Sequence, residues 1–184
     1  MMRWFMLLML CVWPLVSWAD ATAWQAWRDG KAVFIMRHAL APGGGDPSGF
    51  ALEDCSTQRN LNDIGRKQSV AWGEYIRSQH SGPVQVYSSQ WCRCLETAQL
   101  MSLGEVESLP ILNSFFAGQG DRVAQTEGVL RMFSHESVGK PTILVTHQVN
   151  FTALTQIYPS SGEAAILALP LTMPVKILAR IEPR

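Results

Sequence analysis

The residues of this sequence that could do chemistry are two arginines and two histidines, each placed at or just after the end of a short apolar run: Arg37, His38, Arg93 and His147. Guanidinium groups make paired hydrogen bonds with phosphoryl oxygens. A neutral imidazole can attack phosphorus, and water can then hydrolyse the phosphohistidine. His38 would be the nucleophile, with Arg37, Arg93 and His147 around the phosphoryl oxygens. The charge of the arginines would also disfavour protonation of His38.

The apolar runs predict the strands that position these side chains. Residues 31–36, 84–87 and 142–145 are short, apolar and rich in β-formers, which is typical of buried strands. If the three strands are parallel and adjacent, their carboxyl ends meet at one edge of the sheet, where α/β folds bind ligands. We expect Ser89 to cap the next helix, which places Arg93 in a first turn whose free N–H groups also attract anions.

The rest of the chain alternates between helical and extended segments. Asn62 and Asp121 suit helix N-caps. We expect helices at 62–79, 90–103, 121–134 and 149–158, and short strands at 109–112, 164–169 and 175–181. Residues 24–30 would be a short lead-in with one helical turn. This order predicts a single α/β domain, a three-layer α/β/α sandwich with a mostly parallel central sheet. The Gly- and Pro-rich segment 39–59 has no helical period, and its place beside His38 favours a functional loop.

The amino terminus differs from the rest of the chain. A short positive start, an almost wholly apolar stretch at 4–16 and small residues at Ser17 and Ala19 predict a secretory signal peptide at 1–19, cut after Ala19 or Ala21. The alternative, an uncleaved membrane anchor, needs about 20 apolar residues. We therefore expect an exported, periplasmic domain at 20–184 without a stable membrane anchor. The formal net charge of zero and the lack of a basic run argue against nucleic acid as a partner.

Export changes what the cysteines can do. Removal of Cys11 leaves Cys55, Cys92 and Cys94, an odd number in an oxidising compartment. A disulfide from Cys55 to either Cys92 or Cys94 would tie the loop after His38 to the segment that carries Arg93. The alternative is three free thiols. Neither a Cys-x-x-Cys motif nor a zinc-ligand set is present, so we expect no metal and no cofactor.

Several motifs resemble the histidine phosphatase superfamily (phosphoglycerate-mutase-like), in particular its small exported members. Residues 36–39 are similar to the Arg-His-Gly motif, 89–98 to the second motif, 145–147 to the second histidine, and 61–68 to the first helix after the loop. The resemblance implies that His38 is the phosphorylated nucleophile and that Arg37, Arg93 and His147 form the phosphate pocket. Ser89 and Arg59 are further candidates for phosphate binding, although Arg59 could equally be a surface residue of its loop.

The sequence departs from the family pattern at two places. Ala39 replaces the Gly after the first histidine, and Asn113 stands where many members have a Glu that protonates the leaving oxygen. The remaining candidates for this general acid are Asp46, Glu53, Asp54 and Asp121, of which we take Asp121.

The sequence therefore predicts an exported, metal-independent phosphomonoesterase. Its substrate would be an exposed phosphate ester on a sugar, a surface glycolipid or a protein. The resemblance to small exported members of the superfamily, which include heptose-phosphate phosphatases of the lipopolysaccharide core, implies such heptose phosphates as one candidate. The alternative is a non-catalytic phospholigand-binding module with the same pocket.

Overall fold

A computed structural model describes residues 18–184 of the chain. The predicted signal peptide lies outside these residues except for Trp18 and Ala19, so its cleavage stays a prediction. Among the residues described, no helix is both long and apolar enough to cross a membrane.

The centre of the molecule is a six-stranded sheet with the order β3-β2-β4-β1-β5-β6. The strands are β1 (Ala32–Arg37), β2 (Gln85–Ser88), β3 (Val106–Ser108), β4 (Thr142–Thr146), β5 (Ala164–Ala168) and β6 (Ile177–Ile181). The first four of this order pair in parallel, whereas β5 runs antiparallel to both β1 and β6. The predicted, mostly parallel sheet is thus confirmed.

The register brings the functional strand ends together. Arg37 at the end of β1 pairs with Thr146 at the end of β4, and Ser88 at the end of β2 pairs with Val145. The three strands are therefore parallel neighbours, as predicted, and the residues that follow them emerge side by side at one edge of the sheet.

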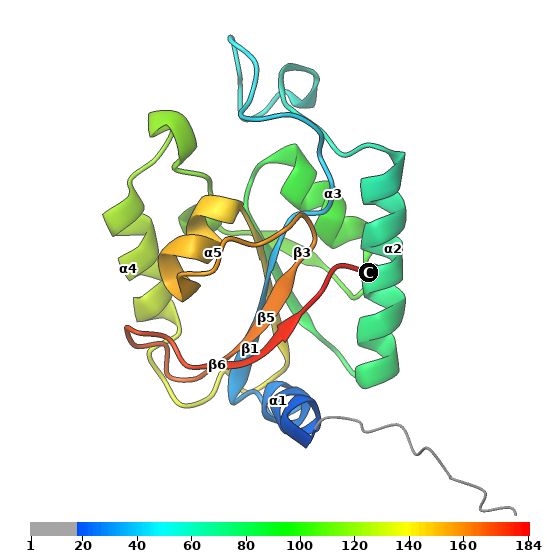
Figure 1. The fold of residues 1–184 in the computed structure, drawn as a ribbon, viewed down its shortest axis with the longest axis vertical. Coiled ribbons are helices and arrows are strands. Elements are labelled where there is room, and N and C mark those ends of the chain that lie inside the picture. Colours follow the sequence, from blue (N-terminus) through cyan, green and yellow to red (C-terminus); the bar gives the residue numbers. More distant parts are fainter. Residues whose placement is uncertain (1–17) are drawn as a thin grey trace, which may run out of the picture.

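Helices cover both faces of the sheet (Figure 1). The helices are α1 (Trp18–Arg28), α2 (Asp63–Gln79), α3 (Cys92–Leu100), α4 (Arg122–Met132) and α5 (Gln148–Thr155). Side chains of β1 alternate between the two layers, as a strand requires: Phe34 and Met36 pack with α1, α2 and α3, whereas Val33 and Ile35 pack with α4 and α5. Both faces are thereby buried, which fits the continuous apolar run of this strand.

Three local predictions were wrong. Most of the segment at 24–30 belongs to a longer helix, α1, which ends at Arg28. Residues 109–112 are not a strand: β3 precedes them, and Pro110–Leu112 forms a 3-10 helix, because proline has no N–H for a ladder but suits a first helical turn. Helix α3 begins at Cys92 with Trp91 as its N-cap, so Ser89 is not a capping residue.

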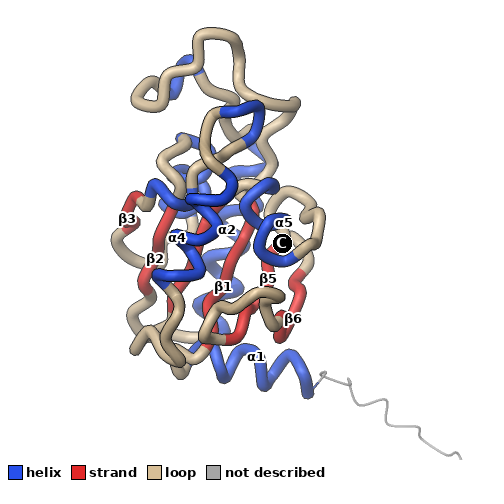
Figure 2. The backbone as a smooth tube through the Cα atoms, turned by 90° about the vertical axis from the view of Figure 1, so that its left-hand side faces the viewer, coloured by secondary structure: helices blue, strands red, loops and turns tan. Residues whose placement is uncertain are grey.

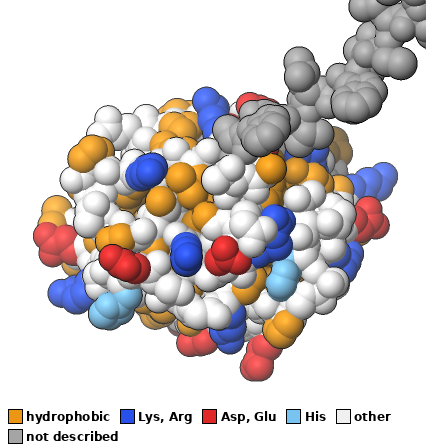
Figure 3. Space-filling model, turned by 90° about the horizontal axis from the view of Figure 1, so that it is seen from below, with side chains coloured by type: hydrophobic (Ala, Val, Ile, Leu, Met, Phe, Trp, Pro, Cys, Tyr) orange, Lys and Arg blue, Asp and Glu red, His pale blue; other side chains and the backbone are white. Residues whose placement is uncertain are grey.

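The segment between β1 and α2 stands above the carboxyl edge of the sheet (Figure 2). It contains one short 3-10 helix, Cys55–Thr57, and leads into α2 through Asn62, whose side chain accepts a hydrogen bond from the Gly65 N–H as predicted. Seen from below, on the opposite side, charged side chains of both signs are interspersed (Figure 3).

Two glycines let α2 lie against backbone that leads to the site. A Cβ at Gly65 would be 2.2 Å from the carbonyl oxygen of Leu40, and one at Gly73 would be 2.0 Å from that of Met101, just after α3. Both distances are far below contact, and a backbone carbonyl cannot turn aside as a side-chain tip can. The glycines weaken the helix by themselves, but they are what allows its close packing.

Replacing Gly73 with alanine should therefore destabilise the protein although alanine favours helices. We expect Gly73→Ala to lower the free energy of unfolding by ~1–3 kcal/mol, as overpacking does. Lys67→Ala, at an exposed position of the same helix, should change it by less than ~0.5 kcal/mol. Denaturant unfolding followed by tryptophan fluorescence measures both, and a Gly73→Ala protein as stable as the wild type would contradict the close packing.

Candidate active site

The predicted residues converge on one cavity of about 170 Å³ at the carboxyl edge of the sheet. His38 follows β1, His147 follows β4, and Arg93 lies in the first turn of α3, which follows β2. The centroids of the two imidazole rings are 5.6 Å apart, and the rings meet edge to face. The charged or titratable lining residues other than Tyr158 are Arg37, His38, Asp46, Arg59, Arg93 and His147.

His38 is oriented by its own backbone. Its Nδ1 lies 2.8 Å from the carbonyl oxygen of Ala39. A carbonyl oxygen only accepts, so Nδ1 carries the proton, and Nε2 keeps its lone pair. The side chain is buried, which lowers its pKa well below 6.5, and the charge of Arg93 lowers it further. His38 is therefore a neutral imidazole with a free nitrogen in the cavity.

His147 is held between a cation and a hydroxyl group. Arg93 Nη2 donates to His147 Nδ1 over 3.5 Å, and His147 Nε2 lies 2.8 Å from Ser89 Oγ. Because a guanidinium only donates, Nδ1 accepts and Nε2 carries the proton. Burial and then Arg93 lower the pKa of His147 well below 6.5, so both histidines are neutral.

Two other guanidinium groups line the same cavity. Arg37 donates from Nη1 to the carbonyl oxygen of Pro159 over 2.9 Å. Arg59 donates to the carbonyl oxygens of Gly45 and Ala41. Its pKa falls to about 10, first because it is desolvated and then because Arg93 is close. Arg59 is thus part of the cavity rather than a surface residue.

Not all of these N–H groups have partners. The Nε atoms of Arg37 and Arg93 are buried without a hydrogen-bond acceptor among the described residues. A buried, unsatisfied charged donor is costly. An anion in the cavity would supply the missing acceptors.

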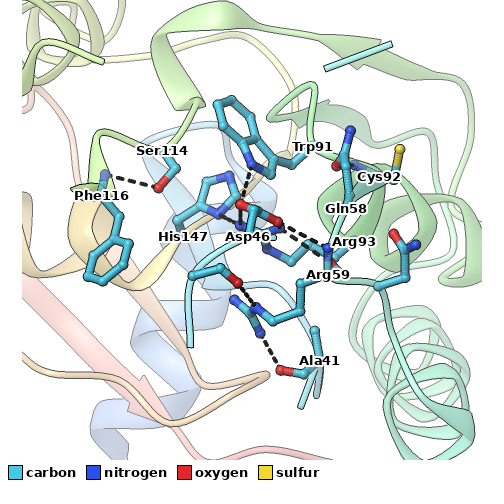
Figure 4. A network of polar contacts seen from close by, with 12 residues as sticks. Ala41, Asp46, Gln58, Arg59, Trp91, Cys92, Arg93, Ser114, Phe116 and His147 are labelled. Atoms are coloured by element: carbon cyan, nitrogen blue, oxygen red, sulfur yellow. Dashed lines mark hydrogen bonds and ion pairs between the residues drawn. The ribbon is translucent and has the colours of Figure 1, made fainter. Parts of the chain in front are cut away.

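Asp46 is the one carboxylate among the described residues that line the cavity. Its two oxygens accept from both terminal nitrogens of Arg93, at 2.6 and 3.2 Å (Figure 4). Burial alone would raise the pKa of Asp46, but its hydrogen bonds with Arg93, the Arg59 backbone and Trp91 lower it overall. The cavity is lined by three guanidinium groups, of Arg37, Arg59 and Arg93, and by one carboxylate. Its lining therefore has an excess of two positive charges.

Comparison with known proteins decides the family. The model of the histidine phosphatase superfamily (branch 1) matches residues 33–127, more than half of the chain. The chain belongs to the histidine phosphatase superfamily. A search of curated proteins found no match.

Solved structures of similar fold include proteins named as phosphatases. The protein histidine phosphatase SixA complexed with tungstate is 17% identical with a TM-score of 0.56, over 82% of this chain and 96% of that one. A putative phosphohistidine phosphatase SixA from Agrobacterium tumefaciens is 17% identical with a TM-score of 0.58, over 84% and 99%. A mycobacterial glucosyl-3-phosphoglycerate phosphatase with inorganic phosphate is 14% identical with a TM-score of 0.56, over 80% and 95%.

In this member of the superfamily, Ser89 and Asn113 support His147. Ser89 does not line the cavity; its hydroxyl contacts His147 Nε2 and lies 3.2 Å from Asn113 Oδ1. The Asn113 carbonyl oxygen accepts from Asn150 of α5 over 2.8 Å. Asn113, at the place of the usual acidic residue, is thus a structural link between the β2–α3 turn and α5.

Asp121, our choice for the general acid, is not brought to the cavity. It is exposed, and its carboxylate caps α4 by accepting from the backbone N–H groups of Val123 and Ala124. Two aromatic residues that no motif indicated also line the cavity. Phe116 and Tyr158 are half and three-quarters exposed at its mouth.

The disulfide joins Cys55 to Cys92, and Cys94 is free and buried. The choice between Cys92 and Cys94 is thereby resolved. Gln58 reinforces the link by accepting a hydrogen bond from the Cys92 N–H over 2.9 Å. Burial raises the pKa of the Cys94 thiol to about 12, so this cysteine stays protonated. The bridge fixes the loop that carries Arg59 to the first turn of α3, beside Arg93.

The neutral state of both histidines can be measured. In phosphate-free buffer, the ring resonances of His38 and His147 should titrate only well below pH 6.5. Protons bind the unfolded imidazoles at a higher pH than the folded ones, so their contribution should also lower the free energy of unfolding as pH falls below 6.5. Proton NMR with assignment by substitution measures the rings, and a titration midpoint near 6.5 for His38 would contradict its desolvation.

Proposed function

We propose that this chain is an exported phosphomonoesterase that hydrolyses phosphate esters through a phosphohistidine on His38, without a metal ion. The observation that carries the proposal is the pairing of a free, neutral His38 Nε2 with unpaired, buried N–H groups of Arg37 and Arg93 in one cavity. An attack on a phosphoryl group needs a nucleophile, here His38 Nε2, and hydrogen-bond donors for the phosphoryl oxygens, here the arginine N–H groups.

The first step is an attack of His38 Nε2 on phosphorus. The P–O bond to the leaving group breaks as the N–P bond forms, and the Nδ1–H bond to the Ala39 carbonyl oxygen stabilises the positive charge that develops on the ring. Arg37, Arg59 and Arg93 balance the charge on the phosphoryl oxygens. Water then attacks the phosphohistidine and releases inorganic phosphate.

The absence of a metal is part of the proposal. Among residues 18–184 there is no group of three or more His, Cys, Asp or Glu side chains placed to hold an ion. The excess of two positive charges among the lining residues instead matches a phosphate dianion.

The size of the cavity favours substrates whose leaving group stays outside it. A volume of about 170 Å³ is below the ~300 Å³ of ordinary small-molecule pockets, so it suits a phosphoryl group with little else. The rest of the substrate would lie at the mouth, against the exposed rings of Phe116 and Tyr158. Sugar phosphates and glycolipid phosphates could be accommodated in this way. The names of the structural neighbours add protein phosphohistidine and phosphoglycerate esters as substrate classes.

The second candidate function is phospholigand binding without turnover. It is favoured by Asn113, which cannot act as an acid and has a structural role instead. It is disfavoured by His38, because a pocket that only binds an anion does not need a free imidazole nitrogen.

Trapping the phosphohistidine tests the proposal. Wild-type protein mixed briefly with para-nitrophenyl phosphate in the presence of EDTA, then quenched at alkaline pH, should gain one phosphoryl group that maps to His38 by mass spectrometry. His38→Ala should lose the adduct and at least ~10³-fold of turnover, as loss of a nucleophile does.

The control is His135→Ala, at an exposed position far along the chain, which should leave both adduct and turnover unchanged. Neither adduct nor released phosphate from the wild type would overturn the phosphatase. If His38→Ala then still bound inorganic phosphate, the binding module would be the better interpretation.

Export rests on residues 1–19 and on the disulfide. The charged start, the apolar run and the small residues at Ser17 and Ala19 support cleavage by a signal peptidase, and the Cys55–Cys92 bridge suits an oxidising compartment. Expressed in a bacterium, the full chain should reach the periplasm with a new amino terminus at Asp20 or Thr22. Amino-terminal sequencing of the periplasmic fraction measures this, and an intact Met1 on membrane-bound protein would contradict it.

A further inference from the structure

Neither Asn113 nor Asp121 can be the general acid of the proposed reaction, because an amide is not an acid and Asp121 does not line the cavity. Of the described residues that line the cavity, Asp46 is the only one with a carboxyl group. Its side chain is 2% exposed. It accepts four hydrogen bonds, two from Arg93, one from Trp91 Nε1 at 3.0 Å and one from the Arg59 N–H at 3.1 Å.

These hydrogen bonds occupy the nitrogens that a phosphoryl group needs. Both terminal nitrogens of Arg93 donate to Asp46, so the paired face of this guanidinium already holds an anion. A carboxylate and a phosphoryl group use the same two-point contact with arginine. A phosphoryl group bound between His38 and Arg93 must therefore compete with Asp46.

The loop that carries Asp46 allows the carboxylate to withdraw. Gly43, Gly44 and Gly45 precede it, and Gly43 and Gly45 have φ angles of 95° and 72° that favour glycine. A Cβ at Gly44 would have no neighbour within 4 Å. Three glycines thus permit other backbone conformations here, where the Gly45 carbonyl accepts from Arg59. The other end of the loop is held by the disulfide at Cys55.

We propose that the phosphoryl group of the substrate displaces Asp46 from Arg93, and that the freed carboxyl group of Asp46 is the proton donor to the leaving oxygen. This inference rests on the proposed function. Once Arg93 turns to the phosphoryl oxygens, Asp46 loses its cation and lies beside a dianion. Both changes raise the pKa of a carboxyl group, so Asp46 takes up a proton when substrate binds.

The proton and electrons then balance over two steps. As His38 Nε2 attacks phosphorus, the P–O bond pair moves to the leaving oxygen, which takes the proton of Asp46 and departs as an alcohol. In the second step the Asp46 carboxylate removes a proton from the attacking water, the N–P bond breaks, and its electron pair returns to His38 Nε2.

The dependence on the leaving group separates this role from a structural one. Para-nitrophenyl phosphate has a leaving group that needs no proton, whereas glycerol phosphate needs one. Asp46→Asn should reduce kcat for glycerol phosphate by ~10²–10⁴-fold and kcat for para-nitrophenyl phosphate by less than ~10-fold. The same variant should bind tungstate or inorganic phosphate more tightly than the wild type, because the competing carboxylate is gone. Asp121→Asn, which replaces the exposed cap of α4, should treat the two esters alike.

A second measurement uses the wild type, because loss of Asp46 could prevent folding. The ¹³C resonance of the Asp46 carboxyl group should move toward that of a protonated carboxyl as inorganic phosphate saturates the site. A resonance that stays at its ionised value at saturation would overturn the displacement.

Equal losses for both esters in Asp46→Asn would make Asp46 a positioning residue of Arg93, which overturns the inference while the phosphatase stands. If the wild type hydrolyses neither ester and forms no phosphohistidine, the proposed function and this inference fail together.

Discussion

A buried guanidinium group must have partners, and much of this site follows from that requirement at Arg93. Its side chain is 3% exposed, and it lies in a helical turn that opens directly onto the ends of β1 and β4. Its terminal nitrogens donate to Asp46 from a distant loop and to the ring of His147, whereas its Nε has no acceptor among the described residues. The Cys55–Cys92 bridge, the Gln58 contact and the Trp91 hydrogen bond all help to hold that loop against α3.

The same burial sets the protonation of the two histidines. Each ring is desolvated and lies close to Arg93, and both effects disfavour the imidazolium form. Backbone and hydroxyl partners then fix which nitrogen carries the proton. One ring presents a lone pair to the cavity, while the other is tied to Arg93 and Ser89. Two residues of the same type thus have different chemistry because their partners differ.

Much of the sheet and the cationic part of the site could be predicted from the sequence. Each of three apolar runs predicts a buried strand with functional residues at or shortly after its carboxyl end. Because parallel strands end at the same edge of the sheet, the meeting of His38, Arg93 and His147 could be predicted from the three runs. The strand predicted at 109–112 was wrong because the apolar composition of this segment outweighed Pro110. Proline has no N–H for a strand ladder, and the segment forms a 3-10 helix after β3.

The remaining parts depend on tertiary contacts that carry no local signal. Nothing in the sequence of residues 39–59 says which side chain reaches Arg93, since a loop without a period has no predictable facing side. Ser89 looked like a helix cap because of its type and position, but the helix begins three residues later and its hydroxyl contacts a histidine instead.

The proposed position of the general acid at Asp46 follows from what Asn113 and the loop after His38 can each do. Asn113 cannot supply a proton. Its side-chain oxygen instead accepts from the Gln90 N–H in the β2–α3 turn over 2.8 Å, and its backbone carbonyl accepts from Asn150 of α5. A residue held by these hydrogen bonds is poorly suited to move toward the leaving oxygen of a substrate. The loop after His38 is the better candidate, because three glycines at 43–45 permit other backbone conformations while its far end is anchored by the disulfide. On the proposed mechanism, the Asp46 carboxylate pairs with Arg93 until a phosphoryl group displaces it, so the same ion pair would contribute both to the stability of the protein and to its reactivity.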